Sequence, residues 1–478
     1  MKIAFAASEV WPFIKTGGLG DVAEALPKAL SEYKDSEVAV FLPYYKSIKQ
    51  NPEVKTDLVS VFETRLAWRR CYVGLYRLKS RRKKLRIYFI DNEQYFARDR
   101  IYGEPDDGER FAFFSKAVLE SLTVLSYAPD IIHCNDWQTA LIPTLLHAFY
   151  EDTLGGAKTV FTIHNIEYQG WAHTDFLSDV LALPGGYESR FDFHGSVNFM
   201  KSAVLGSDAV TTVSRTYAKE ICYPYFAHGL EDIMRDHAFK TVGIVNGINT
   251  ELNSPKSDKF LIKNYDEKSF DDGKRECKAA LQAELGLPVR EDVALIGIVS
   301  RLVGHKGFDI IYEAIDEMME LDVQLVILGT GDPFYEKRLS EAASRYPDRL
   351  SLNLGFSGAV ASRVYAASDI YLMPSRSEPC GLSQLIAMRY GAVPVVHETG
   401  GLKDTVTPFV GESGEGLGFT FGSFTAEDMM CALYRALDVY RTKGHLWRRV
   451  VYNGMSADFS WSSPAEEYMA LYKKLKNS

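Results

Sequence analysis

The sequence predicts an α/β protein in which two doubly wound parallel sheets follow each other along the chain. Three observations lead to this fold class. The chain has 478 residues, which is more than one hydrophobic core usually organises. Short continuous apolar runs alternate with amphipathic helical patterns, as is typical of parallel strands buried on both faces. The alternation occurs twice, and a polar stretch around residues 246–272 separates the two series.

The first series covers residues 1–245, where we expect an N-terminal Rossmann-like domain. Its predicted strands are the apolar runs 3–7, 38–42, 87–90, 131–134, 160–163, 209–213 and 242–245. Helical patterns follow several of these runs, at 111–125, 137–150 and 197–205. Residues 72–78 and 85–90 depart from this rhythm, because they flank Ser80-Arg81-Arg82-Lys83-Lys84 and indicate a hairpin. A solvated turn explains these basic residues more simply than a polyanion site.

The second series covers residues 246–478, where we expect a C-terminal Rossmann-like domain. The polar stretch at its start reads as the link between the domains and the entry to a helix. Strands are predicted at 294–299, 324–328, 370–373 and 393–396, and helices at 308–321, 335–345, 359–367 and 382–389. Three further helical patterns, at 426–439, 445–457 and 464–475, end the chain.

Composition excludes several classes of protein. The net charge of −9 argues against a general role at nucleic acids or membrane surfaces. No apolar run reaches the roughly 18 residues of a membrane span, and the N-terminus enters a predicted strand at once, so we expect a cytoplasmic protein. The six cysteines are scattered, which fits reduced thiols better than disulfides or a zinc site.

A glycine-rich loop, Lys15-Thr16-Gly17-Gly18-Leu19-Gly20-Asp21, joins the first predicted strand to the first predicted helix. Glycines let a ligand approach the backbone closely, and the start of a helix offers N–H groups and a positive dipole end. With the lysine charge these features suit an anionic group such as a phosphate. On its own, the loop fits an ordinary strand-to-helix turn with a surface lysine equally well.

Polar side chains follow several other strands of the first series. Ligands of doubly wound sheets bind at the carboxyl ends of the strands, so these positions matter most. Asp136 and Trp137 suit a sugar, since a carboxylate binds hydroxyls and an indole packs against C–H groups, although Asp136 fits equally well as a helix cap. His164 can be a base, a donor or a structural residue. Asn165 and Asn246 add two more polar groups.

The strand ends of the second series carry cations, a carboxylate and another glycine pair. Arg301 and Lys306 follow one predicted strand and suit a diphosphate, because a guanidinium forks onto phosphate oxygens and an ammonium adds charge. Glu378, in Glu378-Pro379-Cys380-Gly381, suits sugar hydroxyls. Thr399-Gly400-Gly401-Leu402 starts a helix and forms a second expected anion cradle.

Taken together, these motifs resemble those of the bacterial glycogen synthases and plant starch synthases. The resemblance rests on the Lys15–Asp21 loop, His164-Asn165, Arg301 with Lys306-Gly307, Glu378-Pro379-Cys380-Gly381-Leu382 and Thr399-Gly400-Gly401-Leu402, in this order. It implies a GT-B fold of family GT5, in which two Rossmann-like domains face a central cleft. It also implies that residues of about 460–478 return to pack on the first domain.

The resemblance implies a retaining, metal-independent transfer of glucose from ADP-glucose to the non-reducing 4-OH of an α-1,4-glucan, either glycogen or a maltooligosaccharide. It implies no cofactor, since ADP-glucose is a substrate, and no nucleic-acid or membrane partner. The implied catalytic residues are Lys15, His164, Arg301, Lys306 and Glu378. The implied donor site adds Thr16, Gly17, Gly18, Asn246, Phe356, Cys380, Gly381, Leu382, Thr399, Gly400 and Gly401. The implied acceptor and sugar site consists of Tyr95, Asp136, Trp137, His164, Asn165 and Asp21.

Leaving-group chemistry agrees with this assignment, because cations and helix-end amides can neutralise departing ADP without a metal. No carboxylate stands out as a nucleophile. The resemblance implies a front-face reaction, in which the carbonyl of His164 steadies the cation-like sugar. Three positions depart from related enzymes: Ile386 replaces a glutamate of the wider superfamily, and Asn249 and Leu252 lie near the hinge. Two alternative functions remain, a nucleotide-sugar 2-epimerase of the same fold and a non-catalytic glucan- or nucleotide-sugar-binding protein.

Overall fold

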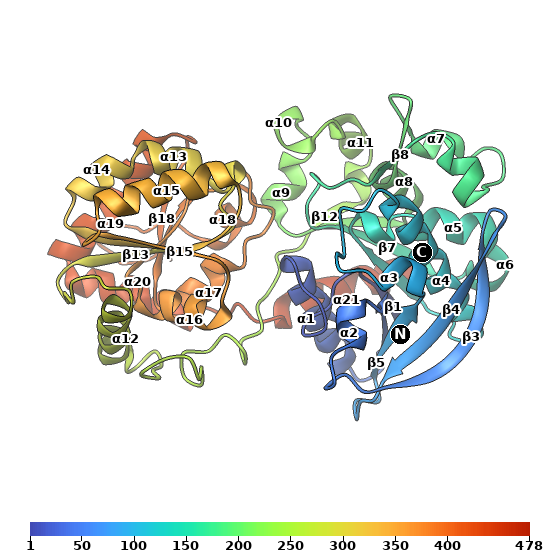
Figure 1. Cartoon of the computed structure of the whole chain (residues 1–478), viewed down its shortest axis with the longest axis horizontal. Helices are drawn as coiled ribbons and strands as arrows, with labels where there is room; N and C mark the ends of the chain where they lie inside the picture. Colours follow the sequence, from blue (N-terminus) through green and yellow to red (C-terminus); the bar gives the residue numbers. More distant parts are fainter. The chain divides into compact units, whose positions relative to one another are not determined.

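The computed structural model describes residues 1–478 and divides the chain into two compact units (Figure 1). The first unit consists of Met1–Gly247 and Trp461–Ser478, and the second of Ile248–Ser460. Each unit is built around its own sheet, so the α/β class and the two tandem sheets predicted from the sequence are confirmed. None of the helices combines the length and the apolar character needed to cross a bilayer.

The first unit contains a nine-stranded sheet in the order β12-β11-β7-β6-β1-β2-β5-β4-β3. Its parallel strands are β1 (Lys2–Ala6), β2 (Glu37–Pro43), β5 (Leu85–Asp91), β6 (Ile131–Asn135), β7 (Lys158–Ile163), β11 (Ala209–Thr212) and β12 (Thr241–Gly243). Each of them matches an apolar run of the sequence. The central strands are buried along nearly their whole length, which explains why they read as continuous apolar runs rather than as alternating ones.

A long hairpin at one edge of this sheet is only partly predicted. The strand β4 (Arg69–Leu78) pairs antiparallel with β5, as the sequence predicts, but also with β3 (Thr56–Leu66) (Figure 1). The sequence does not predict β3 because most of its apolar side chains stay out of the core: Leu58 is 54% exposed and Val61 is 53% exposed, and only Leu66 at its end is fully buried. Such a strand lacks the buried pattern by which the others were found.

Helices cover this sheet, and several differ from the prediction. The principal helices are α1 (Gly18–Glu32), α4 (Asp107–Val124), α5 (Ile142–Phe149), α8 (Phe199–Gly206), α9 (Arg215–Glu220) and α11 (Glu231–Asp236), and the short ones are α2 (Lys46–Lys49), α3 (Glu93–Phe96), α6 (Glu151–Leu154), α7 (Glu188–Phe191) and α10 (Pro224–Ala227). The helix predicted at 137–150 is instead a 3-10 turn, Trp137–Thr139, followed by α5, which has Pro143 in its first turn. The helix predicted at 197–205 begins two residues later, where the Asn198 side chain accepts a hydrogen bond from the Lys201 N–H.

The remaining elements of the first unit are a small sheet and the last helix. The strands β8 (Trp171–Ala172), β9 (Asp192–Phe193) and β10 (Ser196–Asn198) form the three-stranded sheet. The helix α21 (Ser462–Lys476) belongs to this unit although it is last in the sequence. It packs near α1, and its Tyr472 hydroxyl lies 2.6 Å from Nδ1 of the fully buried His133 on β6.

The second unit contains a six-stranded parallel sheet in the order β15-β14-β13-β16-β17-β18. Its strands are β13 (Ala294–Val299), β14 (Val323–Gly329), β15 (Leu350–Leu354), β16 (Ile370–Met373), β17 (Val393–His397) and β18 (Phe419–Phe421). Figure 1 shows α13 and α15 on one side of this sheet and α12 and α16 on the other, as a doubly wound fold requires.

The helices of the second unit are α12 (Phe270–Glu284), α13 (Phe308–Glu313), α14 (Ile315–Glu320), α15 (Pro333–Arg345), α16 (Gly358–Ala367), α17 (Ser383–Arg389), α18 (Gly400–Thr405), α19 (Ala426–Thr442) and α20 (Gly444–Ser456). The single helix predicted at 308–321 is divided into α13 and α14 at Ala314. The other predicted helices are present with shifted ends.

Candidate functional site

Most of the predicted site residues of the first unit lie just after three adjacent parallel strands. The strand β1 pairs with β6, and β6 pairs with β7. The loop that contains Lys15 follows β1, Asp136 follows β6, and His164 follows β7. Because the carboxyl ends of parallel neighbours lie at one edge of a sheet, this topology brings the three segments to the same edge.

Lys15 is already paired within its own loop. Its Nζ lies 2.6 Å from Oδ2 of Asp21, which occupies the first turn of α1. Burial raises the pKa of Asp21, and the neighbouring Lys15 partly opposes this shift. Both side chains keep a third or more of their surface exposed, so the pair is a weak one that a ligand carrying more negative charge can displace.

Glu9 is a residue of this loop that the sequence analysis missed. Its side chain is 3% exposed and accepts hydrogen bonds from the Thr16 N–H, from Thr16 Oγ1 at 2.7 Å, from the Gly17 N–H at 3.3 Å and from Tyr102 Oη at 2.8 Å. In this conformation of the loop the N–H groups of Thr16 and Gly17 are therefore already bonded to an internal carboxylate and are not free for a phosphate. An acidic residue within an apolar stretch directly after a strand was the signal that could have revealed it.

The Asp136 side chain accepts a hydrogen bond from the loop after β7 and does not cap the 3-10 turn that follows Asp136 in the chain. Its Oδ1 accepts a hydrogen bond from the His164 N–H at 2.8 Å, and its side chain makes no capping bond to the 3-10 turn at Trp137–Thr139. The cap interpretation is therefore wrong. Burial raises the pKa of Asp136 to about 7, and its backbone has a positive φ of 55°, a strained conformation often found at functional sites. Trp137 packs edge-on against Phe111 with 5.0 Å between ring centroids.

His164 is neutral and its tautomer is fixed by a neighbour. Asn135 Nδ2 donates to the Ala6 carbonyl at 3.0 Å, which leaves Asn135 Oδ1 to accept from His164 Nε2 at 3.0 Å. Burial lowers the pKa of His164 to about 3. The ring is therefore an uncharged hydrogen-bonding group at pH 7, with Nδ1 as its acceptor, and it is unsuited to donate a proton as an imidazolium.

The other predicted residues of the first unit differ in their surroundings. Asn246 is 6% exposed and its Oδ1 has no hydrogen-bond partner, which is rare for a buried amide and fits a ligand-binding role. Asn165 Oδ1 accepts from the Glu167 N–H at 3.0 Å. Tyr95 lies in α3, 1% exposed, and its hydroxyl donates to Glu109 at 2.5 Å. The structure thus buries Tyr95 and does not present its ring on the surface.

In the second unit, the structure brings together a predicted cation and a predicted carboxylate. Lys306 follows β13 and Glu378 follows the neighbouring strand β16. The Lys306 Nζ lies 2.6 Å from Glu378 Oε2, which also accepts from Ser375 Oγ at 3.0 Å. The two side chains are only 16% and 8% exposed. Arg301, at the same strand end, is exposed and makes no ion pair.

The glycine pair at the start of α18 allows two backbone segments to touch. A Cβ on Gly400, whose φ is +43°, would lie 2.0 Å from the Glu378 carbonyl oxygen, and one on Gly401 would lie 2.1 Å from the Cys380 carbonyl oxygen. The Gly401 N–H donates to the Glu378 carbonyl at 3.0 Å. The expectation that Gly401 presents its N–H to a ligand is therefore wrong for this state, since the glycines serve the close approach of residues 378–380 instead.

The remaining predicted donor residues lie around the same strand ends. Phe356, after β15, is 78% exposed, which leaves its ring face accessible for stacking. Cys380 and Thr399 are buried, while Leu382 is half-buried. Gly381 has a φ of +72°, which favours glycine at this turn. No group of three or more His, Cys, Asp and Glu side chains is arranged to hold a metal ion.

Two family models match the chain, one in each unit. Residues 2–236 match the starch synthase catalytic domain, and residues 285–437 match the glycosyl transferases of group 1. Among curated proteins, a glycogen synthase of Clostridium novyi is 46% identical over 99% of both chains. A glycogen synthase of Streptococcus agalactiae is 47% identical over the full length of both chains.

Solved structures agree with these matches. The catalytic domain of starch synthase IV from Arabidopsis thaliana, bound to ADP and acarbose, aligns with a TM-score of 0.91 and 35% identity over 100% of this chain and 99% of that one. A sucrose-phosphate synthase from Thermosynechococcus elongatus aligns with a TM-score of 0.61 at 18% identity, which shows a shared fold only. The GT-B fold is thereby confirmed. The matches give no support to the epimerase and binding-protein alternatives.

Proposed function

Because this chain belongs to the family of glycogen and starch synthases, and is thus a glycosyltransferase of glycogen synthesis, we propose that its donor is ADP-glucose. Glucose passes from this donor to the non-reducing 4-OH of an α-1,4-glucan, with retention of the anomeric configuration. The starch synthase with 35% identity holds ADP and acarbose, a nucleotide and a sugar analogue, and this supports both the donor and the acceptor. The exposed Phe356 ring supports an adenine-stacking role.

The observation that carries the proposal is the nearly buried contact between Lys306 and Glu378. A lysine and a glutamate in one small space serve the two ends of a nucleotide sugar: the ammonium binds the diphosphate, and the carboxylate binds glucose hydroxyls. Arg301, which makes no ion pair, adds a forked cation for the same diphosphate. Loss of ADP requires this charge to be neutralised, and such stabilisation is commonly the largest part of catalysis.

We assign the residues of the first unit to the sugar and the acceptor. Lys15 exchanges its Asp21 partner for donor phosphate, and Asn246 turns its unpartnered Oδ1 toward a glucose hydroxyl. Asp136 fixes the backbone of His164 through its 2.8 Å hydrogen bond, which aims the His164 carbonyl at the sugar. In this front-face route, the bond from the sugar carbon to the phosphate oxygen breaks as the acceptor 4-oxygen bonds to the same face. The departing phosphate takes the acceptor proton, so the step needs neither a nucleophilic side chain nor a metal ion.

Glucose incorporation into glycogen tests the donor assignment. The chain is supplied with ADP-glucose and, separately, with UDP-glucose, without added metal. The proposal expects efficient transfer from ADP-glucose and much slower transfer from UDP-glucose. Efficient transfer from UDP-glucose alone would show that the assignment of ADP-glucose as donor is wrong, while glucosyl transfer to glycogen would still hold. The absence of transfer from both donors would show that the proposed reaction itself is wrong.

A further inference from the structure

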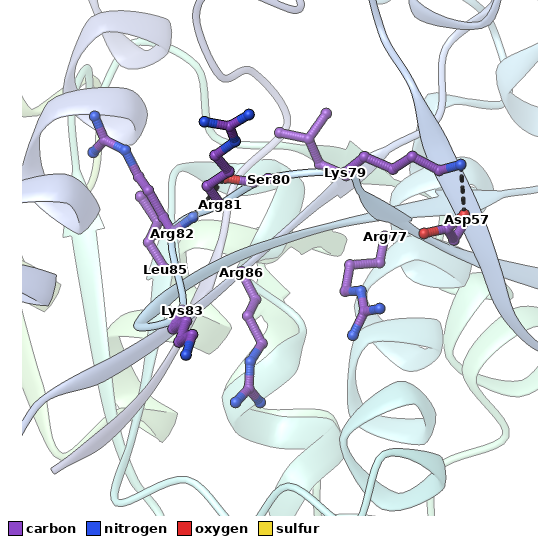
Figure 2. A pocket seen from close by; sticks show the side chains of 10 residues that line it. Asp57, Arg77, Lys79, Ser80, Arg81, Arg82, Lys83, Leu85 and Arg86 are labelled. Carbon is purple, nitrogen blue, oxygen red and sulfur yellow. Dashed lines mark hydrogen bonds and ion pairs between the residues drawn. The ribbon is translucent and has the colours of Figure 1, made fainter.

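A basic cavity lies at the hairpin turn between β4 and β5, away from every residue assigned above. Its volume is about 640 Å³, and it is lined by Leu78, Ser80, Leu85, six basic side chains and one carboxylate (Figure 2). The basic residues are Arg77, Lys79, Arg81, Arg82, Lys83 and Arg86, and the carboxylate is Asp57. The chain as a whole has a net charge of −9, so this concentration of positive charge is local.

Most of these cations have no anionic partner in the protein. Lys79 pairs with Asp57 at 3.0 Å and Arg86 with Glu37 at 3.7 Å, and both pairs are about half exposed. Arg77, Arg81, Arg82 and Lys83 make no ion pair. Figure 2 shows these side chains spread around the turn, with the Lys79–Asp57 contact at one side. Adjacent like charges repel one another, so an anion bound among them would relieve a cost that the free protein bears.

A smaller, mainly apolar cavity adjoins the basic one. Its volume is about 190 Å³, and it shares Leu78, Ser80, Arg82 and Leu85 with the basic cavity. Apolar side chains from the segment 10–13, from α1 and from β2 and β5 form most of the remaining wall, and Glu24 of α1 adds one carboxylate to it. A cavity of this size accommodates a ring or a short apolar group, but it cannot neutralise charge. The two cavities together therefore suit a ligand that is anionic at one end and apolar at the other.

We propose that these joined cavities bind a small organic phosphate. Arginine suits phosphate because its planar fork matches two phosphate oxygens, and four arginines are present here. A neutral glucan offers nothing for these cations to bind. A long polyanion would meet the acidic remainder of the surface. The site goes beyond the transfer reaction, because it contains none of the residues assigned to donor or acceptor.

Occupation of the apolar cavity would reach the Lys15 loop through a short stretch of chain. Residues 10–13 line this cavity and lead directly into the loop. The Trp11 N–H donates to the Gly20 carbonyl at 3.0 Å, and the Ile14 N–H donates to the Val10 carbonyl at 3.1 Å. The first bond ties the cavity wall to the C-terminal part of the loop, and the second holds the segment that leads into Lys15. A bound ligand would therefore act as an effector of that loop.

Titration calorimetry with inorganic tripolyphosphate tests the basic cavity. The full chain carries Arg301→Ala and Lys306→Ala in all samples, so that the proposed diphosphate site cannot bind the probe. In this background we expect binding at one site per chain. The added changes Arg81→Gln, Arg82→Gln and Lys83→Gln should weaken it by about tenfold or more. These residues form an exposed turn, and an unchanged circular dichroism spectrum verifies the fold.

A matched variant removes the same amount of charge elsewhere. Lys256→Gln, Lys259→Gln and Lys268→Gln neutralise three exposed lysines of the second unit, and we expect the affinity to stay within about twofold. The proposal would be overturned if both triple variants lost the same affinity for tripolyphosphate, or if the turn variant bound it as tightly as the parent. It would also be overturned if the parent did not bind tripolyphosphate at all. Binding of single-stranded nucleic acid, but not of tripolyphosphate, at the turn would overturn it as well.

The apolar cavity is tested by comparing phenyl phosphate with inorganic phosphate in the same background. We expect phenyl phosphate to bind more tightly, and the turn substitutions to weaken both. Hydrogen exchange should then slow at residues 77–86 and 10–20 when phenyl phosphate is bound. Equal affinity for the two probes would overturn the assignment of the apolar cavity to the ligand.

Discussion

The carboxylate of Glu9 accepts hydrogen bonds from both the backbone N–H and the side-chain hydroxyl of Thr16. The loop that begins at Lys15 is therefore organised before any ligand arrives, around an anion supplied by the protein itself. The same carboxylate accepts from Gly17 and from Tyr102. We conclude that Glu9 is a positioning residue that fixes the backbone from which Lys15 extends.

Substitution of Glu9 by glutamine should loosen this loop. One carboxylate oxygen becomes an NH₂ group that cannot accept from N–H donors, so buried donors lose their partner at a cost of about 1–3 kcal/mol of unfolding free energy. We expect a lower midpoint in urea unfolding and a raised KM for the donor. Glu32→Gln removes an exposed carboxylate from the end of α1 and should change neither quantity. An unaltered KM in Glu9→Gln would contradict the positioning role.

Loss of the Lys306 ammonium should slow the reaction without unfolding the protein. In Lys306→Ala the proposed diphosphate site loses a nearly buried cation, and we expect kcat/KM to fall by about 10²–10³. The control is Lys337→Ala, which removes a lysine of the same unit whose side chain is 79% exposed. Its activity should equal that of the parent. Equal activity in both variants would exclude Lys306 from catalysis.

A methyl group at Gly400 should separate two segments of the site. The new Cβ would overlap the Glu378 carbonyl oxygen, at 2.0 Å, and the residue would be held at a positive φ. In Gly400→Ala we therefore expect Glu378 to be displaced and activity to fall by about tenfold or more. Gly422→Ala places a methyl group where no atom lies within 4 Å and should be silent. Comparable activity in the two variants would show that close contact at Gly400 is dispensable.

Acid should destabilise the protein in part through His133. Burial lowers the pKa of His133 to about 3, so the unfolded chain binds more protons than the native one between about pH 3 and 6.5. The contribution is fully present above pH 6.5 and is lost as the pH falls toward 3, and it amounts to about 2 kcal/mol between pH 7 and 5.

The variant His133→Gln should lack this part of the pH dependence. We expect its unfolding free energy in urea to fall less between pH 7 and 5 than that of the parent, by about 2 kcal/mol. The raised pKa of Asp136 acts in the opposite direction in both proteins, so only their difference is informative. An identical pH dependence in parent and variant would contradict a neutral, buried His133.

The sequence predicted the parallel strands of the first unit and four of the six in the second, because burial on both faces leaves a continuous apolar run. It did not predict β15, which is only partly buried, β18, which has only three residues, or β3, whose Leu58 and Val61 are half exposed. It also did not predict the division between α13 and α14, since the helical period continues across Ala314. The spacing of apolar residues indicates which face of a helix or strand is buried. It gives no information about an element whose side chains are not required to pack against a core.

The sequence predicted which residues belong to the candidate site, but not which groups of the protein those residues contact. Strand-end position and chemistry identified Lys306 and Glu378, and the structure places them 2.6 Å apart. The same reasoning could not find that Glu9 occupies the N–H groups of Thr16 and Gly17, or that Gly401 donates to the Glu378 carbonyl. In both cases a backbone N–H group that the sequence suggests is free to bind a ligand already donates a hydrogen bond within the protein.

The structure explains why asparagine is compatible with position 249, where this chain departs from related enzymes. Asn249 Oδ1 accepts from the N–H groups of Glu251 and Leu252, at 3.1 and 3.0 Å. An aspartate at this position can accept the same two bonds, so asparagine preserves the turn. Ile386 packs against the core of the second unit.

The proposed reaction is tested first by the product formed from ADP-glucose and a maltooligosaccharide in the presence of EDTA. Released ADP and the extended glucan are measured together, and the new linkage is identified by NMR. We expect one ADP for each glucose added, an α-1,4 linkage at the non-reducing end, and no loss of rate when EDTA is present. Free glucose in place of an extended glucan, a β-linkage, or activity abolished by EDTA and restored by a divalent cation would contradict the proposed reaction.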